Sequence, residues 1–298
     1  MSKFYNETQK AQKWAPPAPE SGRLDVVSVI DAIKQSEPST VSGVAFNEPA
    51  VTLVANQGEA ATAPTMDPVQ EKPGKLLIKM PQRFAPLPVP AVEAYGSLRT
   101  RVMKLQGSRG IRSLMLTSSV PAEGKTLTSL NLAVSCAKLH NLRILLVDAD
   151  LRSRGLSRSL KLPDGLGLSD LLAGKVAADK VVLPTEYDNL FVLGAGSLNG
   201  QPSELFASPL WPEFVAWASQ SYGIVIVDAP PIHSLSDAEL ISAGCDGVLM
   251  VVKALSTPRE MAQKCVGRLD KRKLVGIVFN GLPSNPDSDY GYYGVSTN

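Results

Sequence analysis

The nine residues at positions 118–126 have the composition of a loop that binds phosphate. They read Ser-Ser-Val-Pro-Ala-Glu-Gly-Lys-Thr, follow an apolar run and precede a stretch with helical spacing. In such a loop, backbone N–H groups surround the phosphate oxygens, and the helix that follows offers its positive end. Lys125 is expected to reach the β- and γ-phosphates, and the Thr126 hydroxyl to ligate Mg²⁺. The predicted cofactor-binding residues of this loop are Ser119, Val120, Pro121, Ala122, Glu123, Gly124, Lys125, Thr126 and Leu127.

Position 119 departs from the strict pattern of these loops, which has glycine where this chain has serine. Taken alone, the segment would therefore also fit an ordinary strand-to-helix turn that contains Gly-Lys-Thr. Two further apolar runs, each ending in acidic residues, favour the phosphate loop.

The first of these runs, Arg-Ile-Leu-Leu-Val-Asp-Ala-Asp at 143–150, ends in two carboxylates. Strand alternation places Asp148 and Asp150 on the same side, and two carboxylates so close repel each other unless a cation joins them. An Asp that caps a helix beside a solvated Asp is the alternative. The second run ends at Asp228 and continues Ala-Pro-Pro, as in strands whose terminal Asp holds Mg²⁺ directly or through water. The predicted metal ligands are Thr126, Asp150 and Asp228.

Apolar runs alternate with amphipathic stretches from about residue 75 onward, which predicts an α/β fold with a mostly parallel sheet and helices on both faces. Ligands are expected beyond the carboxyl ends of the strands. The expected strands are Ile111–Thr117, Arg143–Asp148, Leu190–Leu193, Ile224–Asp228, Gly247–Val252 and Leu274–Phe279. The expected helices are Val92–Lys104, Lys125–His140, Ser208–Ser219, Asp237–Ala243 and Pro258–Lys271.

The N-terminal part of the chain has a different composition, rich in Pro, Ala, Glu, Ser and Thr. We interpret residues 1–79 as a largely disordered tether, with short helices possible at Lys3–Trp14 and Val26–Lys34. The folded domain is predicted at 80–283, and a flexible tail at 284–298. This tail contains Tyr290, Tyr292 and Tyr293 among Pro, Asp, Ser and Gly, and is thus suited to be a substrate.

Composition excludes several classes of protein. A formal net charge of +2 gives no electrostatic case for binding nucleic acid or an anionic membrane. The three cysteines are widely spaced, which argues against a disulfide framework or a zinc site and fits a reducing cytoplasm. No stretch resembles a signal peptide or approaches the roughly 20 apolar residues of a spanning helix. At a membrane, the chain is expected to need a partner that recruits it.

From about Glu93 to its end, the sequence resembles the bacterial tyrosine kinases of capsule and exopolysaccharide synthesis, in the form made as a separate cytoplasmic subunit. Residues 118–126 resemble the Walker A loop of that family, Val147–Arg152 its Walker A′ motif and Asp228-Ala-Pro-Pro its Walker B motif. Gln201–Leu205 resembles its Asn-Pro-x-Glu-Leu segment, and Val275–Gly281 its last core strand. The tyrosines of the tail stand in the place of the family's tyrosine cluster.

This resemblance implies a P-loop NTPase fold of the deviant-Walker, MinD-like type, and an ATP- and Mg²⁺-dependent tyrosine autokinase that regulates polysaccharide polymerisation and export. It implies Lys125, Asp148 and Asp150 as catalytic residues, with Asp148 orienting or deprotonating the acceptor hydroxyl, and Asn280 facing the adenine. Phosphorylation would occur between copies of the chain on Tyr290, Tyr292 and Tyr293. A membrane polysaccharide co-polymerase, a Wzz-like chain-length regulator, would recruit the kinase to the inner face of the plasma membrane and activate it.

Some residues depart from the family pattern. Gly96 replaces the first arginine of the Glu-x-x-Arg-x-x-Arg motif used for ring assembly, and glycine cannot replace a guanidinium. Two other functions are therefore weighed. A ParA/MinD-type ATPase would need a lysine early in the loop, where this chain has Val120. A nucleotide-gated scaffold without catalysis would need only the binding residues.

Overall fold

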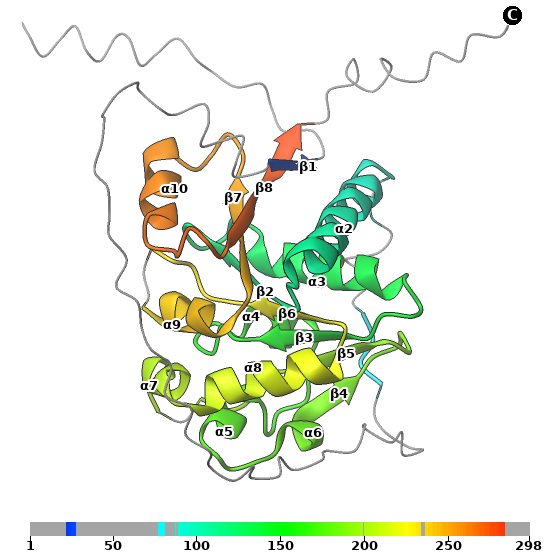
Figure 1. The fold of residues 1–298 in the computed structure, drawn as a ribbon, viewed down its shortest axis with the longest axis vertical. Helices are drawn as coiled ribbons and strands as arrows, with labels where there is room; N and C mark the ends of the chain where they lie inside the picture. The colour runs from blue at the N-terminus through cyan, green and yellow to red at the C-terminus, as the bar shows by residue number, and fades with distance from the viewer. Residues whose placement is uncertain are drawn as a thin grey trace, which may run out of the picture.

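The computed structural model describes residues 22–27, 77–80, 87, 89–198, 200–233 and 236–283. One mixed sheet of eight strands runs through these residues in the order β1-β8-β7-β2-β6-β3-β5-β4 (Figure 1). The strands are β1 (Gly22–Val27), β2 (Ser113–Ser118), β3 (Ile144–Asp148), β4 (Val182–Pro184), β5 (Leu190–Leu193), β6 (Ile224–Asp228), β7 (Gly247–Lys253) and β8 (Leu274–Pro283).

The six inner strands, β8, β7, β2, β6, β3 and β5, are parallel to one another. The two edge strands, β1 and β4, are antiparallel to their neighbours. The helices of the described chain are α2 (Val89–Arg109), α3 (Lys125–Ala137), α4 (Gly155–Ser159), α5 (Leu168–Leu172), α6 (Ala178–Val181), α7 (Pro202–Ala207), α8 (Leu210–Ser221), α9 (Asp237–Gly244) and α10 (Arg259–Val266). The predicted α/β class with a mostly parallel sheet is confirmed.

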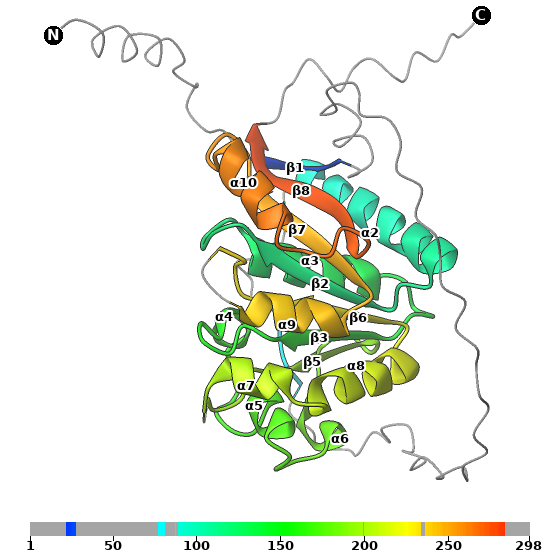
Figure 2. The ribbon, with the colours of Figure 1, turned by 60° about the vertical axis from the view of Figure 1, so that its left-hand side comes forward.

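Helices cover both faces of the sheet, with α2 and α3 on one face and α8, α9 and α10 on the other (Figure 2). The central strands are buried on both sides, and alternate residues enter separate apolar clusters. Leu145 and Val147 pack with the α8 side, whereas Ile144 and Leu146 pack with the α3 side. A strand buried on both faces must be apolar throughout, which explains the continuous apolar runs of the sequence.

All six expected strands are present, with ends shifted by a few residues. Among the helices, the largest differences are at α2, which extends beyond the expected Val92–Lys104 at both ends, and at 258–271, where α10 ends at Val266 and Gly267 begins a turn. Short elements were missed, namely β1, β4 and α4 to α7, because runs of three to six residues carry little periodicity.

The expected helix at Val26–Lys34 is wrong at its start, since Val26 and Val27 belong to β1 and pair with β8. Two adjacent β-branched residues favour the strand, and the edge of β8 offers backbone groups to pair with. The rest of that segment and the helix expected at Lys3–Trp14 lie outside the described residues. Ile78, at the end of the predicted tether, forms a β-bridge with Thr185 and is 4% exposed. The domain limits at 79 and 283 stay a prediction.

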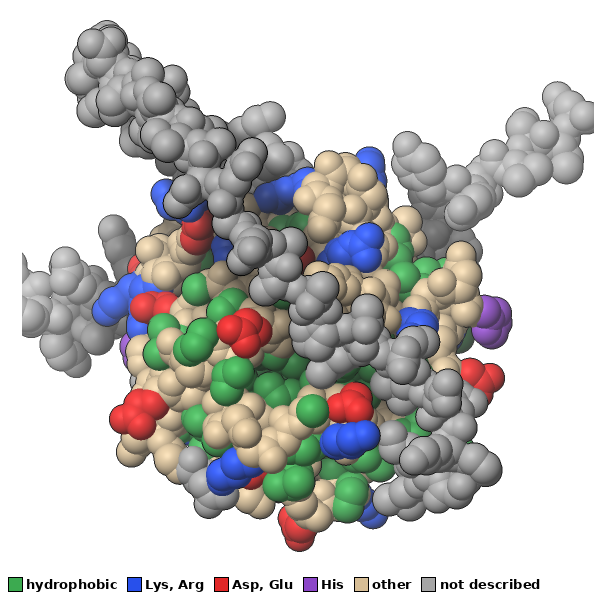
Figure 3. All heavy atoms as spheres, turned by 60° about the horizontal axis from the view of Figure 1, so that its bottom comes forward, with side chains coloured by type: hydrophobic (Ala, Val, Ile, Leu, Met, Phe, Trp, Pro, Cys, Tyr) green, Lys and Arg blue, Asp and Glu red, His purple; other side chains and the backbone are tan. Residues whose placement is uncertain are grey.

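The surface at the α5–α6 end mixes hydrophobic side chains with single basic and acidic ones, and no broad area of one charge appears among its described atoms (Figure 3). None of the helices in the described part of the chain is both long and apolar enough to cross a membrane.

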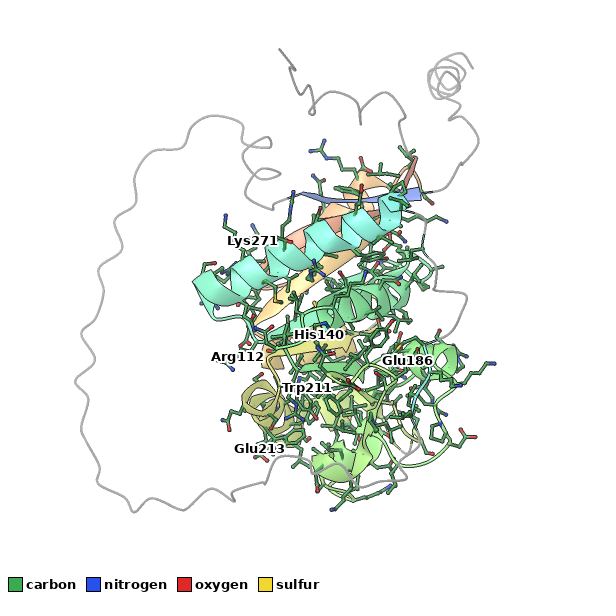
Figure 4. The ribbon with its side chains drawn as sticks, turned by 90° about the vertical axis from the view of Figure 1, so that its right-hand side faces the viewer. Arg112, His140, Glu186, Trp211, Glu213 and Lys271 are labelled. Carbon is green, nitrogen blue, oxygen red and sulfur yellow. The ribbon has the colours of Figure 1, made fainter. Side chains whose placement is uncertain are left out.

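Asp246 joins two strands at the amino edge of the sheet, where Arg112 and Lys271 also lie (Figure 4). Its Oδ2 atom accepts hydrogen bonds from the backbone N–H groups of Arg112 and Ser113, both at 2.9 Å, and from the Ser113 hydroxyl at 2.8 Å. This one carboxylate thus holds the starts of β2 and β7 together.

Asp246→Ala should therefore lower the free energy of unfolding by about 1–3 kcal/mol, because three donors lose their acceptor. Urea titration followed by circular dichroism measures the change, with Glu213→Ala, an exposed carboxylate on α8, as control. Equal midpoints for the two variants would contradict this role.

Candidate functional site

The loop from Ser118 to Gly124 joins β2 to α3 at the carboxyl edge of the sheet, in the place where the sequence predicts phosphate binding. Gly124 has φ of +95° and Ala122 has φ of +66°, so the loop turns its backbone in a conformation that favours glycine. α3 begins at Lys125 without a side-chain cap from the described residues and without an acidic residue in its first turn. Its first N–H groups and its positive end are thus available to an anion.

The side chain of Glu123 fixes the shape of this loop. The residue is 2% exposed, and its carboxylate accepts the N–H of Val120 at 2.9 Å and the hydroxyl of Thr257. The N–H of Lys253 is 3.4 Å from the same carboxylate. Glu123 therefore ties the loop to the end of β7 and to the segment before α10.

The side chain of Asn280 contacts the backbone of this loop. Its Nδ2 atom donates to the Glu123 carbonyl at 2.9 Å, and a Cβ atom on Gly124 would lie only 2.0 Å from it. A side chain at 124 would therefore have to displace Asn280 from this contact and would also be strained at this φ. The structure brings Asn280 to the nucleotide loop, while its predicted contact with adenine stays a prediction.

Lys125 lies between two carboxylates that come from different strands. Its Nζ atom is 2.8 Å from Asp150 Oδ2 and 3.8 Å from Asp228 Oδ1. Burial alone would lower the pKa of Lys125, but Asp228 and Asp150 raise it above its ordinary value. Burial alone would likewise raise the pKa of Asp150, yet Lys125 holds it below its usual range. The Lys125–Asp150 pair is thus favoured in its charged form.

The predicted metal ligands also converge. The Thr126 hydroxyl donates to Asp228 Oδ2 at 2.7 Å, and the Ser129 hydroxyl contacts Asp228 Oδ1 at 3.2 Å. Burial raises the pKa of Asp228, despite the nearby Lys125. No group of three His, Cys, Asp or Glu side chains within the described ranges is arranged to hold a metal ion. Asp150, Asp228 and Thr126 supply two carboxylates and a hydroxyl, which fits Mg²⁺, because this ion takes one or two carboxylates beside phosphate and water oxygens.

Asp148 lies next to Asp228 across the β3–β6 pair but has different partners. Its Oδ2 atom accepts both the N–H and the hydroxyl of Ser157, each at 2.7 Å. Its Oδ1 atom is buried and has no hydrogen-bond partner among the described residues. Burial, with the nearby Asp228 charge, raises the pKa of Asp148 from 3.8 to about 7. Asp148 is thus a buried carboxyl with one oxygen available to accept a proton.

A pocket of about 420 Å³ opens beside these groups. Its volume suits a small-molecule ligand, and Lys125 and the first turn of α3 form one wall of it. Its lining residues are Pro121, Ala122, Gly124, Lys125, Thr126, Leu127, Asp150, Arg152, Ser153 and Pro231. A cation, backbone N–H groups and oxygen ligands for a metal meet in this pocket. A polyphosphate with a bound metal ion requires this combination of groups.

Two other predicted loop residues, Ser119 and Val120, accept hydrogen bonds from within the protein through their backbone carbonyls. The Ser119 carbonyl accepts the N–H of His233 at 3.1 Å, and the Val120 carbonyl accepts the Ser118 hydroxyl at 2.8 Å. The tyrosines at 290, 292 and 293 lie outside the described residues, so their role as phosphoacceptors stays a prediction.

Sequence patterns did not reveal three polar side chains of this site. Ser129 and Ser157 each bind a buried Asp, and Asp237 pairs with Arg152 at 2.9 Å. Ser129 follows Lys125 by one helical turn, a spacing that could have indicated it. Ser157 and Asp237 reach the site only through tertiary folding.

No family model matches the chain. It is 35% identical over 208 residues to the tyrosine-protein kinase YwqD of Bacillus subtilis, an alignment that covers 69% of this chain and 87% of the relative. It is 31% identical over 211 residues to the tyrosine-protein kinase CpsD of Streptococcus pneumoniae, covering 70% and 91%. The tyrosine-protein kinase wzc of Salmonella typhimurium is 34% identical over 208 residues, which are 68% of this chain but only 29% of that protein.

Solved structures give the same result. The kinase domain of the Escherichia coli tyrosine kinase ETK matches with a TM-score of 0.62 and 31% identity, covering 68% of this chain and 80% of the domain. The chimerical protein CapA2B2 matches with a TM-score of 0.63 and 27% identity, covering 71% and 96%. The similarity thus includes fold and sequence over about two thirds of the chain.

The raised pKa of Asp148 predicts how stability depends on pH. The unfolded chain releases this proton near pH 4, whereas the folded protein holds it until about pH 7. Stability should therefore fall as pH rises from about 4 to about 7 and lose no more from this group above that range. Asp148→Asn removes the ionisation and keeps an acceptor for Ser157.

In metal-free buffer at pH 8, Asp148→Asn should be more stable than the unchanged chain by roughly 2–4 kcal/mol, and the difference should shrink towards pH 4. Thermal unfolding across this pH range measures it, with Asp164→Asn, whose side chain is 102% exposed, as control. A difference that grows towards acid pH would show the opposite sign and contradict the assignment.

Proposed function

The chain belongs to the bacterial tyrosine-protein kinases, and we propose how its site performs this reaction and where it acts. The reaction moves the γ-phosphoryl group of ATP to the hydroxyl of a protein tyrosine. One observation carries the proposal: Lys125, Thr126, Asp150 and Asp228 converge at the start of α3. Catalysis of phosphoryl transfer is mainly positioning and charge neutralisation, which such a cluster supplies.

The phosphate loop binds the ATP phosphates with the N–H groups at the start of α3, and Lys125 turns to the β- and γ-phosphates. Thr126 and Asp150 would hold Mg²⁺, with Asp228 as a direct or water-mediated ligand. When bound, the metal neutralises charge that develops on the phosphate oxygens. Asn280 holds the loop through the Glu123 carbonyl, and we expect its side chain to face the adenine.

Asp148 acts as the base. Its unpaired Oδ1 atom takes the proton of the tyrosine hydroxyl while Ser157 holds Oδ2. The tyrosine oxygen forms a bond to the γ-phosphorus, the bond from that phosphorus to the bridging oxygen breaks, and ADP leaves. Because Asp148 is fully buried, this role requires the turn at 150–157 to open when the acceptor binds.

The acceptors are Tyr290, Tyr292 and Tyr293 of a neighbouring copy. The assembly motif on α2 supports only a weak contact between copies, since Gly96 has no side chain and Arg99 donates to the Ser135 carbonyl of its own chain at 2.9 Å. Transfer between copies therefore occurs in encounters that do not depend on this motif.

The kinase acts in capsule or exopolysaccharide polymerisation and export, at the inner face of the plasma membrane. We expect a membrane partner of the Wzz-like co-polymerase class to recruit the kinase to this place, as the resemblance to the capsule kinases implies.

The two other functions are not favoured. The three relatives and the ETK domain described above are named as tyrosine kinases. A ParA/MinD-type ATPase would need an amine at position 120, where the chain has valine and uses its N–H to bind Glu123. A scaffold without catalysis would not need an orphan carboxylate oxygen beside the metal ligands.

Lys125→Met should reduce phosphotyrosine formation at least roughly 100-fold, because the amine neutralises charge in the transition state. The protein is incubated with ATP and Mg²⁺ and probed for phosphotyrosine. Lys138→Met, at the exposed end of α3, is the matched control. Far-ultraviolet circular dichroism checks that both variants fold, and undiminished labelling of a folded Lys125→Met would overturn the mechanism.

Replacing Tyr290, Tyr292 and Tyr293 together with phenylalanine should remove most self-labelling, since only the hydroxyl groups are lost. Mass spectrometry of tryptic peptides locates the phosphate in the unchanged chain. A signal of equal strength in the triple variant would place the acceptor elsewhere.

A further inference from the structure

A second pocket, of about 250 Å³, lies on the other side of the turn that follows Asp150. Sites for drug-sized ligands occupy roughly 300–1,000 Å³, so this volume suits a single side chain better than a nucleotide. Its lining comes from α4, the loop after it, α6, β4 and the end of β5. The residues that the argument uses are Arg154, Ser157, Leu162, Leu166, Lys180 and Leu183.

The turn at 150–157 separates this pocket from the nucleotide pocket. The N–H of Arg154 donates to the Asp150 carbonyl at 2.7 Å, and a Cβ on Gly155 would lie 3.4 Å from the Thr126 hydroxyl. Ser157, in the pocket wall, binds Asp148 at 2.7 Å. Only Ser157 therefore stands between a ligand in the second pocket and the proposed base, Asp148.

The lining combines leucine side chains with two cations, Arg154 and Lys180, and one carboxylate, Asp164. Leu162 and Leu183 form walls, and Leu166 is 60% exposed. Arg154 approaches Asp164 only to 3.8 Å, and its Nε atom is buried with no hydrogen-bond partner in the described chain. Lys180 also lines the pocket but lies 3.1 Å from its neighbour Asp179. Arg154 is thus the donor best able to bind an incoming carboxylate.

We propose that this pocket binds an Asp-Tyr pair of the acceptor segment 284–298 from a second copy of the chain. The tyrosine ring would fill the apolar walls, and the adjacent carboxylate would pair with Arg154. The sequence of that segment supplies this pair at Asp289-Tyr290, with Tyr292 and Tyr293 close behind. One tyrosine docks while a neighbouring one reacts. This inference rests on the proposed function, since it gives that reaction its acceptor specificity.

The test measures phosphorylation of a synthetic peptide of residues 284–298 by the full chain. Arg154→Asn removes the guanidinium, and asparagine tolerates the backbone there, where φ is +49°. The peptide KM should rise about five- to twentyfold, with kcat and the KM for ATP within about twofold. Arg158→Asn, an exposed arginine four residues away and outside the pocket, should change neither constant.

The peptide itself provides the second arm. A peptide with Asp289→Asn should raise KM for the unchanged chain by a similar factor and add little to the effect of Arg154→Asn, because both changes remove one contact. The measurement of the Asp289→Asn peptide on the unchanged chain remains informative even if the Arg154→Asn variant does not fold. Independent effects, or an unchanged peptide KM in both arms, would overturn the pocket while leaving the kinase intact.

Binding without catalysis separates this proposal from the proposed function. If the chain phosphorylates no tyrosine, fluorescence anisotropy of the labelled peptide still reports docking, and loss of that binding in Arg154→Asn but not in Arg158→Asn supports the pocket alone. Displacement of the peptide by inorganic phosphate at equal concentration would indicate a simple anion site and overturn the proposal.

Discussion

Three buried carboxylates and one buried amine set the conditions for the whole carboxyl edge of the sheet. Asp148 and Asp228 end adjacent parallel strands and are paired in register, and Asp150 follows two residues later. An isolated buried charge costs several kcal/mol, so this cluster persists only with compensation. Lys125 compensates Asp150 and Asp228, and the pKa of Asp148, raised to about 7, lets that carboxyl both hold a proton and give it up near neutral pH.

Hydroxyl groups complete the compensation. Thr126 and Ser129, both on the first turns of α3, donate to Asp228, and Ser157 donates to Asp148. Each of them lies on a helix that begins at the carboxyl edge, so the helices position both the donors and their own positive ends near the acids. The apolar strands behind the cluster are rigid because they are packed on both faces. The fold therefore preorganises the amine and the metal ligands, Lys125, Thr126, Asp150 and Asp228.

The sequence predicted the position of a residue where that position follows from the residues next to it in the chain. Continuous apolar runs located all six central strands, and a terminal Asp on a parallel strand has to lie at the edge where ligands bind. Hence Lys125, Thr126, Asp150 and Asp228 could be placed together before any coordinates. Ser157 could not, because its contact with Asp148 depends on how the turn at 150–157 folds back.

The short strands and the contacts of Glu123 could not be predicted from the sequence for a related reason. β4 has only three residues, and β1 is a strand only because β8 offers it an edge, so neither carries a period of its own. Glu123 was predicted as a phosphate contact through its backbone. That its carboxylate joins Val120 to Thr257 follows from the position of the β7–α10 segment, which no spacing within the loop encodes.

The contacts within the cluster also imply that nucleotide and metal bind in a coupled way. Lys125 cannot remain 2.8 Å from Asp150 and also turn to a phosphate, whereas the Thr126 hydroxyl can keep donating to Asp228 while its oxygen lone pair ligates a cation. Each partner that binds releases a group which the other needs: Lys125 leaving Asp150 frees a carboxylate for the metal, and a metal on Asp150 frees the amine for phosphate. Linkage makes this effect reciprocal, so the affinity for each should rise in the presence of the other. The same exchange withdraws the ion pair that holds the start of the turn at 150–157, which links occupation of the nucleotide pocket to the wall of the acceptor pocket behind it.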